Sequence, residues 1–177
     1  MRGTLKFLLV LVVALLAMLL FRALAFTSYT VTGDGLAPVF VAGDRVLVNR
    51  WSYGLRTGAH GSLFPYGRLC RQPVAKGDYV AFEDSLGRVL VCQCEAVPGD
   101  TVSYENRLQV VPGRFNCSRE DYYWLRSLNA ANPLDSRVLG FVPESTIIGR
   151  ACLIIFSHDP AYPFWDGYVG SRFLLLP

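Results

Sequence analysis

The sequence predicts a mostly β domain that follows one N-terminal transmembrane helix. An almost unbroken apolar run covers residues 5–26. After it the chain changes to short β-rich runs separated by Gly, Pro, Asn and Asp. The length of 177 residues allows one hydrophobic core and is short for two. We therefore expect a transmembrane anchor over residues 1–26 and one globular domain over residues 27–177.

The N-terminal run is long enough for a single membrane crossing. Such a helix needs about 20 mostly apolar residues. Residues 5–26 supply them if the side chains of Lys6 and Arg22 reach toward the two interfaces. The basic start at Arg2 and Lys6 favours a cytoplasmic N-terminus. The chain is therefore expected to be single-pass in an inner or plasma membrane, with its domain on the periplasmic or extracellular side.

A cleaved secretory signal is the alternative interpretation of this segment. A basic start, an apolar run of about 7–15 residues and a small-residue pair such as Ala23 and Ala25 also describe a signal peptide. We favour the retained anchor. Both interpretations send the residues after Phe26 across the membrane.

The expected strands are runs rich in Val, Ile, Leu and aromatic residues. Residues 84–87 are expected to connect two of them as a hairpin, and residues 98–100 to form a turn in which Gly99 can adopt positive φ. Residues 53–75 and 106–132 contain many turn-forming or polar residues and are expected to be loops or small excursions from the sheet. The expected strands cover residues 45–49, 79–83, 89–97, 147–156 and 173–176.

The charge distribution argues against a nucleic-acid-binding protein. All 14 acidic residues follow Phe26, and removing Arg2, Lys6 and Arg22 from the 17 basic residues leaves 14, so the domain is formally neutral. It has no basic stripe, and its Cys and His residues lack the spacing of a zinc site. We expect no nucleic-acid partner, no metal and no cofactor.

Five motifs occur in order along most of the chain, and together they resemble the sequence boxes of type I signal peptidases. The last motif, which begins Leu-Asp-Ser-Arg and continues through Gly-Phe-Val-Pro, is the closest match. The resemblance implies a folded β-sheet domain behind a membrane anchor. It also implies an endopeptidase that removes signal peptides with a serine nucleophile and a lysine general base. The motifs cover residues 36–48, 51–56, 76–82, 95–102 and 134–151.

The same resemblance places Gly35 at the nucleophile and Cys92 at the general base. A glycine has no side chain that could attack a carbonyl. A lysine base must lose its proton near neutral pH, which an apolar setting promotes, and the two groups are needed together. The chain has only two lysines, Lys6 in the anchor and Lys76 in an expected turn. Catalysis of the family's kind is therefore not expected.

The positions that support catalysis in the family are altered as well. The resemblance places Gly33 where many members have a hydroxyl that helps to bind the oxyanion. It places Pro133 at the serine that orients the lysine. Asp135 and Arg137 are retained, and the resemblance implies a structural role for both.

A replacement nucleophile is the competing hypothesis, with Cys92 or Asp34 taking over. Period-two alternation puts Cys92 on one strand face with Leu90, Cys94 and Ala96, which is typical of small buried residues. Nothing in the sequence places His60 or His158 beside Cys92. We favour the buried, unreactive interpretation.

The preferred function is therefore non-catalytic, with exported proteins or signal peptides and the membrane as partners. An active signal peptidase with a substituted mechanism is one alternative. A structural subunit that stabilises an active paralogue is another.

Two further expectations concern cysteines and aromatic residues. Cys70 and Cys117 are the most suitable pair for a disulfide, because both lie in loop-like segments, whereas Cys92 and Cys94 are badly placed to bridge each other. The aromatic residues could form an apolar surface at the membrane or pack in the core, and core packing is favoured for each one alone. They are Trp51, Tyr53, Phe64, Tyr66, Tyr122, Tyr123, Trp124, Phe164 and Trp165.

Overall fold

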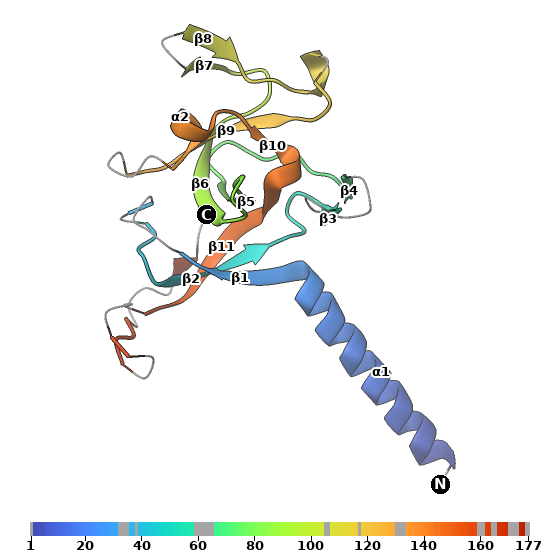
Figure 1. Cartoon of the computed structure of the whole chain (residues 1–177). Helices are drawn as coiled ribbons and strands as arrows, with labels where there is room; N and C mark the ends of the chain where they lie inside the picture. The colour runs from blue at the N-terminus through green and yellow to red at the C-terminus, as the bar shows by residue number, and fades with distance from the viewer. Residues whose placement is uncertain are drawn as a thin grey trace.

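The structure is a computed structural model of the whole chain (Figure 1). It describes residues 2–31, 36–37, 39–58, 66–104, 107–116, 118–129, 134–158, 162–163, 166–169 and 174–175. Within these, the side chains of residues 2, 5, 20, 22–24 and 174–175 are not described.

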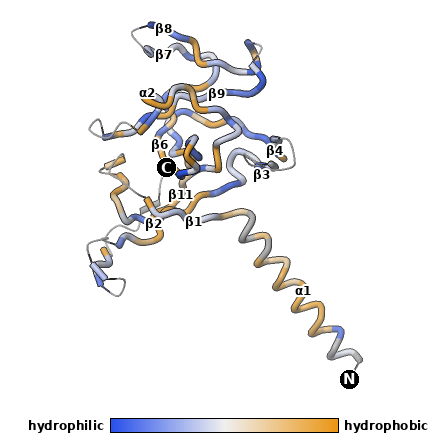
Figure 2. Tube along the Cα trace, in the orientation of Figure 1, coloured by the Kyte–Doolittle hydropathy of each residue, from blue (hydrophilic) through white to orange (hydrophobic). Residues whose placement is uncertain are grey.

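The chain starts with helix α1 (Arg2–Ala25), which continues into strand β1 (Phe26–Thr30) without an intervening residue. The helix extends away from the rest of the protein (Figure 1), and apolar residues follow nearly its whole length (Figure 2). At its end the Arg50 N–H donates to the carbonyl of Ala25 at 2.9 Å, and the rings of Phe21 and Trp51 lie 5.9 Å apart. Among the described residues, no helix is long and apolar enough to be identified as a membrane span.

The rest of the described chain is mostly strand, as predicted. One sheet of eight strands has the order β1-β2-β11-β5-β6-β9-β10, with β12 also paired to β11, and it curls strongly (Figure 1). Two further pairs, β3 with β4 and β7 with β8, are separate. The strands after β1 are β2 (Asp44–Asn49), β3 (Leu55–Thr57), β4 (Gly67–Leu69), β5 (Tyr79–Glu83), β6 (Val89–Ala96), β7 (Thr101–Tyr104), β8 (Arg107–Val110), β9 (Tyr122–Arg126), β10 (Val142–Pro143), β11 (Ile147–Ser157) and β12 (Leu174–Leu175). The short helices are η1 (Arg114–Asn116), α2 (Ser136–Leu139) and η2 (Glu144–Thr146).

The long strand β11 joins the two parts of the sheet. Its first residues pair with β5, and its residues from Arg150 onward pair with β2. Register shifts on both sides of this change bend the strand. Gly149 lies at the bend, where an added Cβ would collide with the backbone of Asn49. The close approach of β11 to Asn49 therefore requires glycine at this position.

The predicted strands are confirmed to within a residue at each described end, and the hairpin and the turn are confirmed too. Asp84 closes the β5–β6 connection, because its carboxylate accepts the N–H groups of Leu86 and Arg88 at 2.9 and 2.8 Å. Gly99 has φ of +96°, as the turn after β6 requires.

The prediction for residues 106–132 was wrong in one respect. Strand β9 lies inside this segment and belongs to the main sheet, between β6 and β10. Its sequence, Tyr-Tyr-Trp-Leu-Arg, has high β propensity. Because polar residues lie on both sides of these five residues, the whole segment was interpreted as a loop. In the described part of residues 53–75, the strands are the small separate pair β3–β4, in agreement with an excursion from the sheet.

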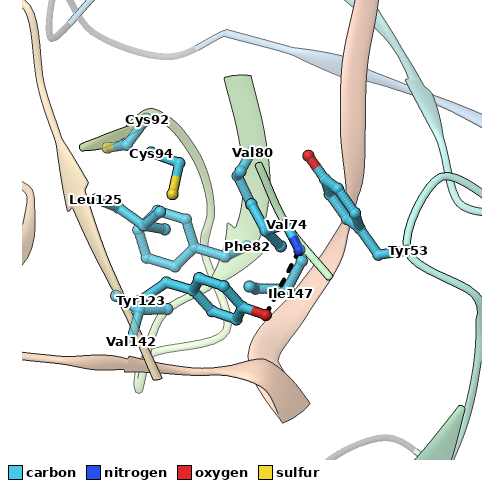
Figure 3. Close-up of a cluster of buried hydrophobic side chains, with 10 residues drawn as sticks. All are labelled: Tyr53, Val74, Val80, Phe82, Cys92, Cys94, Tyr123, Leu125, Val142 and Ile147. Atoms are coloured by element: carbon cyan, nitrogen blue, oxygen red, sulfur yellow. Dashed lines mark hydrogen bonds between the residues drawn. The ribbon is translucent and has the colours of Figure 1, made fainter. Parts of the chain in front are cut away.

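Both faces of the sheet are buried around β5. Val80 and Phe82 point to one side, into a cluster that includes Cys92, Cys94 and Tyr123 (Figure 3). Tyr79 and Ala81 point to the other side, into a cluster with Leu36, Phe40, Val46, Val48, Ile148, Ala151 and Ile154. The expected burial of Cys92, Cys94 and Ala96 on β6 is confirmed.

A buried ion cluster ties the β3–β4 pair to the main sheet. The side chains of Arg68 and Glu144 are 1 % and 2 % exposed. Arg71 donates to both carboxylate oxygens of Glu144, at 2.7 and 2.8 Å, and Arg68 donates to the Glu144 carbonyl at 2.9 Å. Because a buried charge is costly without partners, these contacts hold residues 66–71 against η2.

The cysteine and aromatic expectations have mixed outcomes. Cys70 has an exposed, free thiol, so it is not part of the disulfide that was expected between Cys70 and Cys117. Cys117 itself lies outside the described residues. Tyr53, Tyr123 and Trp124 are buried core residues, whereas Trp51 is 40 % exposed beside α1. Tyr66 and Tyr122 are half-buried, and residues 64, 164 and 165 are not described.

Candidate functional site

Asp135 is the centre of the candidate site. Its carboxylate is fully buried at the N-terminus of α2, where Oδ1 accepts the Arg137 N–H and Oδ2 accepts the Ser127 N–H, both at 2.9 Å. The guanidinium of Arg137 adds hydrogen bonds from Nε at 2.9 and 3.1 Å. The carboxylate therefore joins the end of β9 to the start of α2.

The neighbouring Ser136 strengthens the same junction. Its hydroxyl is buried and accepts the Leu125 N–H of β9 at 2.9 Å. The sequence showed Ser136 as part of a motif but gave no reason to assign it this contact. The acceptor is a side chain in a different segment, and only the fold brings the two together.

The environment of Asp135 determines its charge. Burial by itself would raise the pKa of this carboxyl group, but hydrogen bonds from the Arg137 side chain, the Ser127 N–H and the Arg137 N–H outweigh burial and hold the pKa below its ordinary value of 3.8. Asp135 is therefore ionised at neutral pH.

Cys92 lies on β6 next to this junction. Its side chain is buried among apolar residues (Figure 3), and its thiol donates to the Leu134 carbonyl, with Sγ and O 3.7 Å apart. Burial, and secondarily the charge of Asp135, raises the pKa of Cys92 to about 12. Within the described part of the chain this thiol has no base as a hydrogen-bond partner, so at neutral pH it is a protonated core residue.

The predicted site residues are only partly within the described chain. Gly33, Gly35 and Pro133 lie outside it. The structure does bring Cys92 to Leu134, the residue after Pro133, and it places Asp135 and Arg137 together beside them. The carbonyl of Leu134, which accepts from Cys92, was not predicted.

The other candidate bases have contacts elsewhere. Lys76 lies in the turn before β5, is 57 % exposed and bonds Asp100 at 2.9 Å. His158 contacts the Pro163 carbonyl at 3.1 Å and the ring of Tyr168. Neither set of contacts includes Cys92, and His60 is not described.

Comparison with known proteins gives concordant matches. A family model for signal peptidase, peptidase S26, matches residues 4–115 and 114–156. The chain is 24 % identical to a signal peptidase I from Aquifex aeolicus, over 81 % of this chain and 80 % of the relative. It is 24 % identical to a signal peptidase I from Bacillus caldolyticus, over 82 % and 70 %. It is 25 % identical to a probable signal peptidase I-1 from Synechocystis, over 91 % and 84 %.

Replacing Asp135 with Asn should lower the free energy of unfolding by about 2 kcal/mol at pH 7, the usual scale for hydrogen bonds to a buried charge. Because the pKa of Asp135 is lower in the folded state than in the unfolded state, the ionised carboxylate stabilises the fold at pH values above the unfolded-state pKa. This stabilisation disappears as the pH falls through the folded-state pKa. The difference in stability between wild type and Asp135→Asn should therefore be complete above about pH 5 and shrink in more acidic solution.

Urea unfolding of the full chain in micelles at several pH values measures this difference. Glu95→Gln is the control, because the Glu95 side chain is 44 % exposed in its pair with Arg126, and it should change stability by less than about 0.5 kcal/mol. An Asp135→Asn protein as stable as wild type at pH 7 would disprove the structural role of Asp135.

The thiol of Cys92 should resist alkylation. With its pKa at about 12, about one thiol in 10,000 is ionised at pH 8, and the side chain is also buried. Iodoacetamide should label exposed Cys70 at least about 100 times faster than Cys92 in the folded chain, as peptide mass spectrometry can measure. The difference should vanish in concentrated urea. Fast labelling of Cys92 in the folded chain would instead favour a reactive thiol.

Proposed function

The chain belongs to the signal peptidase family, peptidase S26, and we propose that it is a membrane-anchored member that binds exported polypeptides without cleaving them. The observation that carries this proposal is the state of Cys92. At Cys92, which the sequence resemblance assigns to the general base, the structure has a buried thiol that is protonated at neutral pH and whose hydrogen bond goes to a backbone carbonyl.

The loss of catalysis is supported by several residues together. Gly35 offers no nucleophile, and Pro133 offers no hydroxyl to orient a base. Of the two lysines in the chain, Lys6 belongs to α1 and Lys76 bonds Asp100 in an exposed turn. A nucleophile and its base must meet within hydrogen-bond reach, and Cys92 has no such base among the described residues.

The proposed anchor is the segment 1–26, in an inner or plasma membrane, with the β domain on the periplasmic or extracellular side. The described residues contain no helix that qualifies as a span, so this part rests on the complete sequence of the segment. Between residues 5 and 26 its only charged residues are Lys6 and Arg22. Exposed Trp51, packed against Phe21 where the helix ends, is a residue type that favours the interface.

The proposed binding surface is the outer edge of β1. Among the described strands, β1 lies at the end of the sheet and pairs with β2 alone. Backbone bonds at Ala25 and Val31 point toward β2 and its flanks. In an antiparallel pair, the N–H and C=O groups of successive residues point alternately toward and away from the partner strand. Those of Phe26, Ser28 and Thr30 therefore point away from β2. An extended polypeptide can pair with these groups as an additional strand.

The proposed partners are exported proteins or their signal peptides, with an active paralogue as a second class of partner. The alternative to this binding role is an active signal peptidase with a substituted mechanism. With Cys92 as its nucleophile this mechanism would need the thiol to ionise, and both the burial of Cys92 and the charge of Asp135 oppose ionisation.

The full chain in micelles should bind a fluorescent signal peptide with an Ala-x-Ala site and leave it intact. Anisotropy measures binding, and chromatography of the same samples measures cleavage. Ser28→Pro should weaken binding about tenfold, because it removes one outward N–H of β1. Ser28→Val is the matched control, since it keeps the N–H while losing the same hydroxyl contact with Arg45.

Cleavage at the Ala-x-Ala site that Cys92→Ala abolishes would refute the non-catalytic proposal. Equal binding by wild type, Ser28→Pro and Ser28→Val would refute β1 as the binding edge.

A further inference from the structure

Arg50 lies where helix α1 meets the β domain, directly after strand β2. Its N–H donates to the carbonyl of Ala25, the last residue of α1, at 2.9 Å. On the side of β11, a Cβ added to Gly149 would be 3.0 Å from the Cα of Arg50. The backbone of Arg50 is therefore held between the end of α1 and strand β11, so its side chain starts from a fixed position.

The half-buried side chain of Arg50 forms no ion pair and no hydrogen bond in the described part of the chain. Its Nε is its one buried nitrogen without a bond, so Nη1 and Nη2 are accessible from outside. A partly buried charge without a counterion is costly, so this guanidinium is available to an external anion. Most other arginines of the domain differ in pairing with a carboxylate, namely Arg56, Arg68, Arg71, Arg88, Arg114, Arg126, Arg137 and Arg150.

The segments that build this junction contain no carboxylate. No acidic residue occurs in residues 1–33 or in residues 45–77, which include α1, β1 and the turn that carries Arg50. Asp78 is the next carboxylate along the chain, and it is bonded to Arg150 of β11 at 3.2 Å. The segments around Arg50 therefore supply positive charge and no counterion for it.

The position of Arg50 at the end of α1 indicates which anion it meets. Trp51 follows it and is 40 % exposed, and its ring lies 5.9 Å from that of Phe21, about one helical turn before the end of α1. Phe26, where α1 leaves the domain (Figure 1), is 42 % exposed. An exposed Trp at the end of an apolar helix is typical of the membrane interface, the level of the lipid headgroups. A guanidinium at that level can bind a phosphate with two parallel hydrogen bonds.

We propose that Arg50 binds the phosphate of an anionic phospholipid headgroup at the point where α1 leaves the β domain. The accessible Nη atoms donate to the phosphate oxygens, and Trp51 lies beside the lipid just below them. This inference rests on the proposed membrane anchor. The lipid contact would hold the domain close to the membrane surface, and with it the edge of β1, which continues directly from α1.

Native mass spectrometry of the full chain in micelles tests this site by titration with single lipids. The probes are phosphatidylglycerol and phosphatidylcholine with the same acyl chains, because both have a phosphodiester but choline compensates its charge. Wild type should bind phosphatidylglycerol about fivefold more tightly, the usual effect of one basic residue on binding to anionic lipid. Glycerophosphoglycerol, the same headgroup without acyl chains, should show no binding at about 1 mM, since one exposed ion pair contributes little alone.

Variants locate the site. Arg50→Gln should bind the two lipids equally, whereas Arg50→Lys should keep a preference of at least about twofold, because it retains the charge and loses the paired hydrogen bonds. Arg126→Gln is the matched control and should keep the full preference. Arg126 is bonded to Glu95 at 2.8 Å on β9, which lies away from α1 (Figure 1). Thermal unfolding confirms that each variant folds before its binding is interpreted.

Equal binding of the two lipids by wild type, which needs no variant, would overturn the inference, and so would a preference that Arg50→Gln retains. Binding of glycerophosphoglycerol as tight as that of the lipid would show a site for soluble phosphodiesters instead.

Extraction with alkaline carbonate from phosphatidylcholine vesicles tests the anchor separately. A full chain that is extracted would overturn the anchor and this lipid site together. A chain that resists extraction but has no preference for phosphatidylglycerol would overturn the lipid site alone.

Discussion

The buried carboxylate of Asp135 is the constraint on which the rest of the candidate site depends. It accepts backbone N–H groups from two segments and two further hydrogen bonds from Arg137. A buried charge is tolerated only when it is bonded in this way, so the end of β9 and the start of α2 have one stable arrangement. That arrangement brings the carbonyl of Leu134 to the thiol of Cys92 on β6.

The apolar surroundings of Cys92 have opposite consequences for a thiol and for an amine. Burial disfavours the charged form of any group, so it raises the pKa of the cysteine here and would lower that of a lysine at the same place. An unprotonated lysine is what the family's chemistry requires. The setting of Cys92 therefore suits the general base that the sequence resemblance assigns to this position, although a protonated thiol cannot act as that base. The proposal of an inactive member with a retained frame follows from this contrast.

The local sequence pattern correctly predicted strands and turns whose signals lie in neighbouring residues. The strand at residues 79–83 and the turn at Gly99 both have clear signals in neighbouring residues, and the structure confirms them. Strand β9 was missed because its five residues lie within a long polar segment. The contacts of Asp135 with Ser127 and of Ser136 with Leu125 could not be predicted, since each joins separate segments through the tertiary fold.

The most direct test is to introduce together, in the full chain, the family's residues at the three positions that the sequence resemblance assigns to the nucleophile, its base and the residue that orients the base: Gly35→Ser, Cys92→Lys and Pro133→Ser. If the frame around Asp135 keeps the family's geometry, the triple variant should cleave a preprotein after its Ala-x-Ala site, with activity that rises with pH as the lysine loses its proton. Leaving out either Gly35→Ser or Cys92→Lys should abolish that cleavage. A folded triple variant that still binds signal peptide but never cleaves it would contradict the claim that the frame survives.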